Sequence, residues 1–260
     1  MKTFNSEVFL LQNYKKLSSS RIKYVGNPFR CARVRLLTRS FLFSKSWIDS
    51  SSKTDPPPDF YNKKHHIMME VMRIDDSICE PRGKQVINSF KKENACLRAY
   101  FGNDFKNKRD DISVYVNTDT SDSNVFNFNG YLKTFKRVVL EHSRRAPLYH
   151  KNHRECDDLI FLIFDESNCY VQVAKEDDLL KEGNTDLQLT NAIFHGWYND
   201  KLFIDILKDC KADYVIWVGW NKRITIKNKE LKTPLICIYD IKNIKDSFGV
   251  VYKHNLMLKI

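Results

Sequence analysis

The sequence of 260 residues predicts an α/β protein with a mixed central sheet flanked by helices. Two patterns carry this prediction. Short apolar runs rich in Ile, Val, Leu and Phe, which are typical of strands covered on both faces, recur along the chain. Between them lie segments whose apolar residues repeat at helical spacing, and this alternation predicts helices packed on a sheet. An apolar fraction of 42% and this length suffice for a sizeable hydrophobic core.

The first 53 residues are set apart by their charge. They contain eleven Lys and Arg against two acids, a net charge of +9, whereas the other 207 residues carry only +2 of the total of +11. We therefore expect a basic N-terminal segment, residues 1–53, forming an arm or subdomain, and an α/β core domain, residues 54–260. A concentrated basic segment fits contact with a polyanion, most often nucleic acid, although a basic surface can also serve solubility alone.

Two elements are expected within the basic segment. Ser6 can cap a short helix that reaches Tyr14. The residues from Cys31 to Phe43 alternate as a strand does, and on that period three arginines share one face. With Arg30 they suit the bidentate guanidinium contacts that a phosphate backbone accepts, so we expect nucleic-acid binding at Arg30, Arg33, Arg35 and Arg39.

The compartment is predicted from three features. The seven cysteines include no Cys-x-x-Cys pair, so neither a disulfide framework nor a zinc site is indicated. No apolar stretch approaches the roughly 20 residues that cross a bilayer, which predicts no membrane contact. We expect a cytoplasmic protein. Because the first 50 residues are rich in Arg and Ser and poor in acids, a mitochondrial transit peptide is the alternative.

Glu70 is the main candidate for a functional residue in the core domain. It stands in the middle of an apolar strand, residues 67–74, where a period of two gives it the same face as Met68, Met72 and Ile74. A buried carboxylate costs several kcal/mol unless a cation or a dense set of donors meets it. Three prolines end the loop of residues 49–58 before the strand, and Asp59, which follows them, is the nearest group that would share a cation with Glu70.

The chain after this strand continues the alternation. The spacing of apolar residues predicts a helix from Tyr131 to about Arg145, which Pro147 stops, with Lys133, Lys136 and Arg137 on its outer face. We expect Lys133 and Arg137 to bind the nucleic-acid backbone together with the arginines of the basic segment. Further helices are expected within residues 84–100 and over 199–210. The expected strands are 112–116, 158–164 with its hairpin partner 169–174, 214–220, 235–239 and a last element within 250–260. Asp165 and Glu166 end a buried strand, where the catalytic groups of α/β proteins often lie, but they would equally cap a turn.

The residues Pro58-Asp59 and, after ten intervening residues, Glu70-Val71-Met72 resemble the motif of the PD-(D/E)XK nuclease superfamily, which includes many restriction endonucleases. The family pattern has Pro-Asp at the start of one strand and Asp/Glu-x-Lys on the next. The resemblance implies a restriction-endonuclease-like core and a divalent metal, usually Mg²⁺, held by Asp59, Glu70 and the backbone carbonyl of Val71. It also implies metal-dependent hydrolysis of phosphodiester bonds, in DNA rather than RNA, with a protein partner or a homodimer as a further expectation.

The sequence departs from this family at Met72, which stands where the family has its lysine. Family members sometimes recruit the cation from elsewhere, and Lys136 is our candidate for that catalytic role, with Lys64 as the alternative. Without such a cation the domain would be a non-catalytic nucleic-acid-binding or interaction module with a degenerate nuclease-like fold. Independently of any family, Asp59 would serve as the hydrogen-bonding residue of a turn, and Glu70 would form an ordinary ion pair in a partly covered strand.

Overall fold

The computed structural model describes residues 21–39, 46–50, 58–76, 127–174, 192–219, 222, 225–226, 229–230 and 233–259. The helices expected over residues 6–14 and within 84–100, and the strand expected over 112–116, lie outside the described residues. In the part of the chain that is described, no helix combines the length and the apolar character that a membrane crossing requires.

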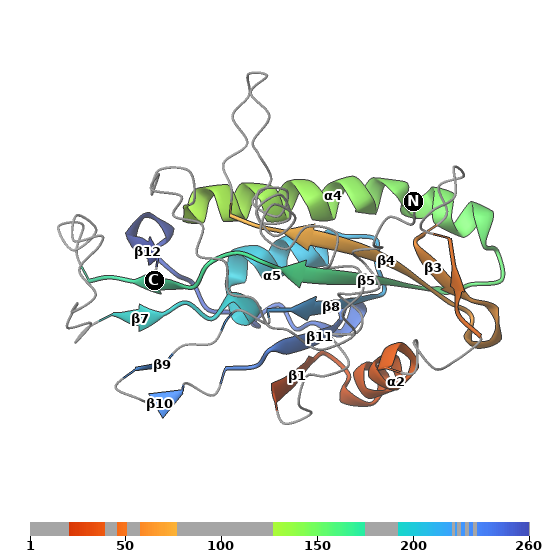
Figure 1. Cartoon of the computed structure of the whole chain (residues 1–260), viewed down its shortest axis with the longest axis horizontal. Helices are drawn as coiled ribbons and strands as arrows, with labels where there is room; N and C mark the ends of the chain where they lie inside the picture. The colour runs from red at the N-terminus through yellow and green to blue at the C-terminus, as the bar shows by residue number, and fades with distance from the viewer. Residues whose placement is uncertain are drawn as a thin grey trace, which may run out of the picture.

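A seven-stranded mixed sheet forms the centre of the molecule (Figure 1). Its strands, in order across the sheet, are β1 (Ile22–Val25), β11 (Ile236–Asp240), β8 (Tyr214–Val218), β5 (Asp158–Asp165), β4 (Ile67–Ile74), β3 (Phe60–Asn62) and β2 (Ile48–Asp49). β4, β5 and β8 are parallel to one another. β3 is antiparallel to both of its neighbours, and β11 is antiparallel to β8. The predicted mixed sheet is confirmed.

Helices cover both faces of this sheet, so the core has two sides. The helices that do so are α2 (Pro28–Arg39), α4 (Phe128–Asn152) and α5 (Lys201–Lys208). Met68 and Met72 of β4 belong to one hydrophobic cluster with residues of α4 and α5. Met69 and Val71 belong to a second cluster with residues of α2. The period of two predicted for this strand is therefore confirmed, and the face that carries Glu70 is the one covered by α4.

The strand expected from Cys31 onward is wrong, because these residues form the helix α2. The side-chain oxygen of Asn27 accepts hydrogen bonds from the backbone N–H groups of Phe29 and Arg30, at 3.0 and 3.3 Å, and Pro28 occupies the first helical position. Both are standard signals of a helix start. These signals outweigh the short alternation of arginine and aliphatic residues that follows. Cys31 and Val34, which lie one helical turn apart, are both buried, so the helix has one face in the core.

The helix α4 is longer than the spacing of apolar residues predicts. It begins after Asn127, whose side chain accepts a hydrogen bond from the N–H of Gly130 at 2.8 Å. Pro147 was expected to stop it but lies inside it, so that prediction is wrong. Proline removes one helical hydrogen bond. Ala146 and Tyr149, on either side of it, are each only 1% exposed, and their burial accounts for the continuation of the helix.

The expected hairpin between residues 158–164 and 169–174 is also wrong. Both edges of β5 are occupied, by β4 and by β8, so no hairpin partner has access to it. β6 (Tyr170–Gln172) instead pairs with β12 (Met257–Lys259) and β7 (Ile193–Phe194) in a separate three-stranded sheet. The other elements expected after residue 190 are present as α5, β8, β11 and β12.

The described residues of the basic N-terminal segment are part of the central sheet and its covering layer. β1 pairs in parallel with β11, and β2 pairs with β3. The side chains of α2 complete the second hydrophobic cluster. Residues far apart in the sequence, at positions 22–25 and 236–239, are thus neighbours in one sheet.

Candidate functional site

Asp59 and Glu70 lie opposite each other on two neighbouring strands. The antiparallel register pairs Phe60 with Met69, so the next position along pairs Asp59 with Glu70. Side chains directly opposite in such a pair share one face of the sheet. The backbone N–H of Asp59 donates to Oε2 of Glu70 at 3.2 Å, and the N–H of Val71 donates to Oδ2 of Asp59 at 2.8 Å. The structure therefore brings the two predicted carboxylates together.

Two side chains of the helix α4 interact with the carboxylate of Glu70. Nδ1 of His142 lies 2.7 Å from Oε1 of Glu70, and the hydroxyl of Tyr149 is a further hydrogen-bond partner of this carboxylate. Burial and then the negative charge of Glu70 raise the pKa of Tyr149 well above its usual value, so the hydroxyl is a neutral donor. Glu70 is 6% exposed, while Asp59 and His142 are partly exposed. The pair thus lies at the margin of the core, and a dense set of donors offsets the cost of burying Glu70.

The donor atoms at this pair suit a hard divalent cation. A carboxylate has about four lone-pair positions, and three donors are described for Glu70, which leaves capacity for a metal. The N–H and carbonyl of one strand residue point to the same edge, so the carbonyl of Val71 faces the side where its N–H meets Asp59. Among the described residues no group of three or more His, Cys, Asp or Glu gathers to hold a metal. Mg²⁺ needs only one or two carboxylates, with waters and substrate phosphate completing its shell.

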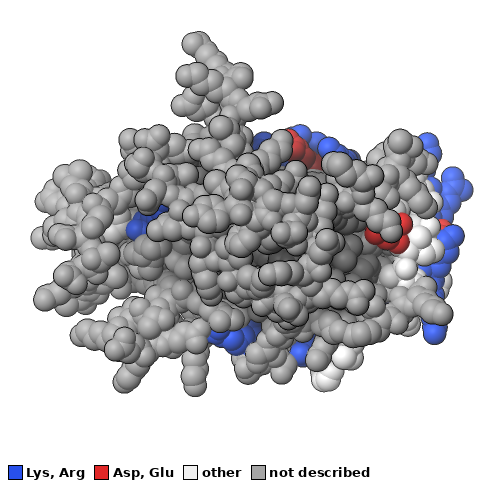
Figure 2. Space-filling model, in the orientation of Figure 1, with Lys and Arg blue, Asp and Glu red and all other residues white. Residues whose placement is uncertain are grey.

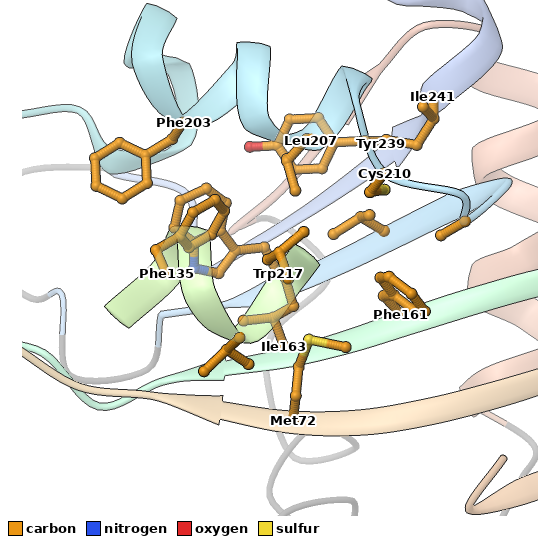
Figure 3. Packing of buried hydrophobic residues seen from close by; sticks show 14 of the residues in the cluster. Met72, Phe135, Phe161, Ile163, Phe203, Leu207, Cys210, Trp217, Tyr239 and Ile241 are labelled. Atoms are coloured by element: carbon orange, nitrogen blue, oxygen red, sulfur yellow. The ribbon is translucent and has the colours of Figure 1, made fainter. Parts of the chain in front are cut away.

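Met72 lies on the same face of β4 as Glu70 and is buried in an apolar cluster. It is 3% exposed and packs in the cluster between the sheet and α4 (Figure 3). Figure 3 shows its side chain extending toward Ile163, in the cluster that also contains Phe135 and Trp217. Because methionine is uncharged, position 72 supplies no cation beside Glu70, although the two residues share one face of β4.

Lys136 and Lys64, the two lysines considered for the missing cation, are both exposed. Lys136 precedes His142 by six residues of α4, which places it about 120° around the helix and about 9 Å along its axis. It is therefore not on the flank of α4 that meets Glu70. Lys64 belongs to the short turn between β3 and β4, at the end of the hairpin away from Asp59.

The arginines of the N-terminal segment do not share one face, because they lie on a helix. Nε of Arg30 donates to the hydroxyl of Tyr214 at 2.8 Å and lies 3.4 Å from a carboxylate oxygen of Asp240. Nη1 of Arg35 donates to the hydroxyl of Tyr24 at 3.1 Å. Arg33 is exposed. The backbone of Arg39 ends α2, and its side chain lies outside the description.

Basic side chains of α4 form a separate surface. Lys133, Lys136, Arg137, Arg144 and Arg145 are all exposed, and Arg137 pairs with Glu141 at 3.3 Å. Figure 2 shows Lys and Arg atoms along the upper edge of the molecule, where α4 runs in Figure 1. Because α2 and α4 cover opposite faces of the sheet, their basic residues face opposite sides of the molecule. The acidic pair lies on the α4 side.

A second polar cluster lies at the carboxyl end of β5, where the sequence indicated Asp165 as a catalytic or turn-capping residue. Asp165 is completely buried and accepts hydrogen bonds from Tyr131, Ser167 and Trp217. Nζ of Lys222 lies 3.5 Å from Asp165, and it donates to the Oγ of Ser167 at 2.5 Å. Burial, then the charge of Asp165, raise the pKa of Tyr131. Every one of these groups has partners inside the cluster, so the arrangement is that of a structural core network.

A buried aspartate also fixes the carboxyl-terminal part of the chain. Asp200 caps α5 by accepting from the N–H of Leu202 at 2.9 Å. Its other oxygen lies 2.7 Å from Nε2 of His195 and 2.9 Å from Nε2 of His254. One surface pocket lined by described residues, of about 440 Å³, contains neither Asp200 nor the Asp59–Glu70 pair. It mixes both signs of charge, with Lys211 and Asp213 among its residues.

Sequence reasoning found Asp59 and Glu70 but missed the residues that hold them. His142 falls on the apolar face of the predicted helix, and a polar residue on that face was the signal for a buried partner. Tyr149 was missed because the helix was expected to stop at Pro147. In the comparisons with known proteins, no family model, no curated protein and no solved structure matches this chain.

Proposed function

We propose that the protein is a metal-dependent nuclease that hydrolyses phosphodiester bonds at the Asp59–Glu70 pair. The observation that carries the proposal is the cross-strand pairing of these two carboxylates, each of which accepts a hydrogen bond from the backbone of the other's strand. The positions of the motif residues on the strands support the resemblance to the PD-(D/E)XK superfamily, because Pro58-Asp59 immediately precedes β3 and Glu70 lies on the adjacent strand β4.

The residues of the site have separable roles in this proposal. Asp59, Glu70 and the carbonyl of Val71 would hold Mg²⁺. When bound, the metal would activate a water molecule and neutralise charge on the scissile phosphate. His142 and Tyr149 orient Glu70 through its hydrogen bonds, which keeps the carboxylate aimed toward Asp59. Lys133 and Arg137, which are exposed on α4, lie on the same side of the sheet and would attract the nucleic-acid backbone.

A direct test compares the wild type and three variants on supercoiled plasmid, duplex DNA and duplex RNA, with Mg²⁺ and with EDTA. Asp59→Asn and Glu70→Gln preserve size and most hydrogen bonds, and Asp246→Asn is the matched control because Asp246 is exposed and pairs only at the surface with Lys208. We expect cleavage by the wild type and the control that EDTA abolishes, and a loss of at least about 100-fold in both site variants. Cleavage that survives both site variants would exclude this site.

A non-catalytic nucleic-acid-binding module is the second candidate, and one observation favours it. Met72 occupies the position of the family lysine and is enclosed by the core. This candidate predicts salt-sensitive retention of DNA or RNA with no cleavage in Mg²⁺, and retention unchanged by Glu70→Gln. Fluorescence anisotropy of the same four proteins at two salt concentrations separates the two candidates.

A further inference from the structure

We infer that Arg145 of α4 supplies the cation that position 72 lacks, by contacting a phosphate oxygen of the nucleic acid held beside Asp59 and Glu70. This inference rests on the proposed function. It replaces Lys136, which lies on another flank of the helix, with a residue on the flank that meets the acidic pair.

The helix spacing places Arg145 at this flank. It follows His142 by three residues and precedes Tyr149 by four, and residues three and four apart on a helix are neighbours on one face. His142 and Tyr149 are the two α4 residues that contact Glu70. Arg145 therefore lies between the two points at which α4 meets the acidic pair, one turn from each.

Its surroundings leave the guanidinium available. Arg145 is exposed, and among the described residues no hydrogen bond or ion pair engages its side chain. By contrast, Arg137 on the same helix is paired with Glu141. Burial and the charges of Glu70 and Asp59 raise the pKa of Tyr149, and the positive charge of Arg145 acts in the opposite direction and lowers it. Asp59, Glu70 and Arg145 therefore all lie close enough to influence the hydroxyl group of Tyr149.

The chemistry of the group fits the role. A guanidinium is always charged and binds phosphate oxygens through two parallel hydrogen bonds, which a methionine does not provide. A cation aimed at the oxygens on which negative charge develops stabilises the transition state more than the ground state. Removal of Arg145 should therefore reduce the rate of cleavage more than the affinity for the nucleic acid.

The experiment uses the full chain with Arg145→Ala, Arg145→Lys, Arg144→Ala and Lys136→Ala. Arg144 is the matched control, because it is an equally exposed arginine on the same turn but only two residues from His142, so it faces away from Glu70. Affinity for a fluorescein-labelled duplex DNA is measured in EDTA at two salt concentrations, and the rate of cleavage is measured under single-turnover conditions in Mg²⁺. Circular dichroism verifies that each variant is folded.

We expect Arg145→Ala to weaken binding in EDTA by at least about fivefold and to slow cleavage by a further factor of at least about ten, the loss typical of one charged hydrogen bond. Arg145→Lys should recover part of the rate, and Arg144→Ala and Lys136→Ala should stay within about twofold of the wild type. If the wild type cleaves and Arg145→Ala behaves as Arg144→Ala does, this inference is wrong while the nuclease proposal stands. If nothing cleaves but Arg145→Ala alone loses affinity, the nuclease proposal is wrong and the phosphate contact stands. If Arg145→Ala keeps both the cleavage rate and the affinity of the wild type, Arg145 has no role in either step.

Discussion

Nδ1 of His142 on α4 lies 2.7 Å from Oε1 of Glu70 on β4. This contact joins the helix to the one charged residue on the face of the strand that it covers. It gives Glu70 a fixed orientation at the margin of the core, and it makes the stability of the fold depend on a group that we assign to the active site.

We predict that His142→Ala destabilises the protein by about 1–3 kcal/mol, because it leaves an oxygen of the buried Glu70 without this donor. His150→Ala, on the same helix but without a described bond to Glu70, is the control. Urea unfolding gives the free energy of unfolding of each variant. The double variant that adds Glu70→Gln should cost less than the sum of the single changes, and strict additivity would contradict a direct interaction.

Mg²⁺ should stabilise the folded protein if the acidic pair binds it. At a free concentration ten times the dissociation constant, ligand binding to the native state alone adds about 1.4 kcal/mol to the free energy of unfolding. Thermal unfolding with and without Mg²⁺ should show this increase for the wild type and not for Asp59→Asn. An equal increase in both proteins would mean that Mg²⁺ binds elsewhere.

Lys222→Met should be severely destabilising, because the completely buried Asp165 then loses its cation. Breaking one partner of a buried ion pair typically costs about 3–5 kcal/mol. Lys242→Met tests the contrast, since Lys242 pairs with Asp213 but its side chain is largely exposed, and solvent screens that pair. Chemical denaturation of the two variants measures the difference, and equal losses would show that Lys222 is not needed to balance Asp165.

The stability of the fold should decrease in acid in two steps. Burial lowers the pKa of His195 despite its bond to Asp200, so the unfolded chain takes up a proton first, and stability is lost as the pH falls below about 6.5. Burial acts to raise the pKa of Asp200, but the bonds from His195 and His254 outweigh it and lower that pKa. Its contribution is therefore present above the ordinary carboxyl pKa, near 4, and is lost at lower pH.

Melting temperatures measured between pH 8 and pH 3 test this behaviour. His195→Gln should flatten the step near pH 6 while His65→Gln leaves it unchanged, because His65 is partly exposed in the β3–β4 turn. A wild-type melting temperature that is constant from pH 7.5 to 5.5 would contradict the assignment to His195.

Asn27→Ala should cost about 1 kcal/mol, because the side chain of Asn27 caps α2, and Asn27→Asp should restore most of the loss. Thermal or urea unfolding of the two variants measures it. If residues 31–43 were a strand, neither change would have a systematic effect.

The fold class was predictable because the buried strands are long and apolar, and β5 and β8 appear where their sequences indicate. The errors arose where a local pattern competed with information from distant parts of the chain. The alternation after Cys31 has a period of two, yet Asn27 and Pro28 set a helix start. The hairpin after β5 failed because the pairing of β4 and β8 with both edges of β5 is decided only in three dimensions.

Two of the residues proposed for the active site were predictable from spacing, because ten residues between Asp59 and Glu70 suffice for a tight hairpin with antiparallel strands. The α4 residues that contact Glu70, His142 and Tyr149, were not predictable. Which turn of a 25-residue helix lies above Glu70 depends on how the helix is placed on the sheet, and the sequence between residues 76 and 127 does not specify that placement by any pattern we found. For this reason Lys136 was a reasonable expectation, and Arg145 followed only from the contacts of His142 and Tyr149.

The pairing of β1 with β11 limits how the amino terminus could be processed. A protease that cut near residue 50 would remove the edge strand β1 and the helix α2, whose residues Cys31 and Val34 cover the sheet, and would expose the apolar face of the sheet to water. Any sorting peptide removed during import would therefore have to be severed ahead of Ile22, and mass spectrometry of the mature amino terminus would locate the cut.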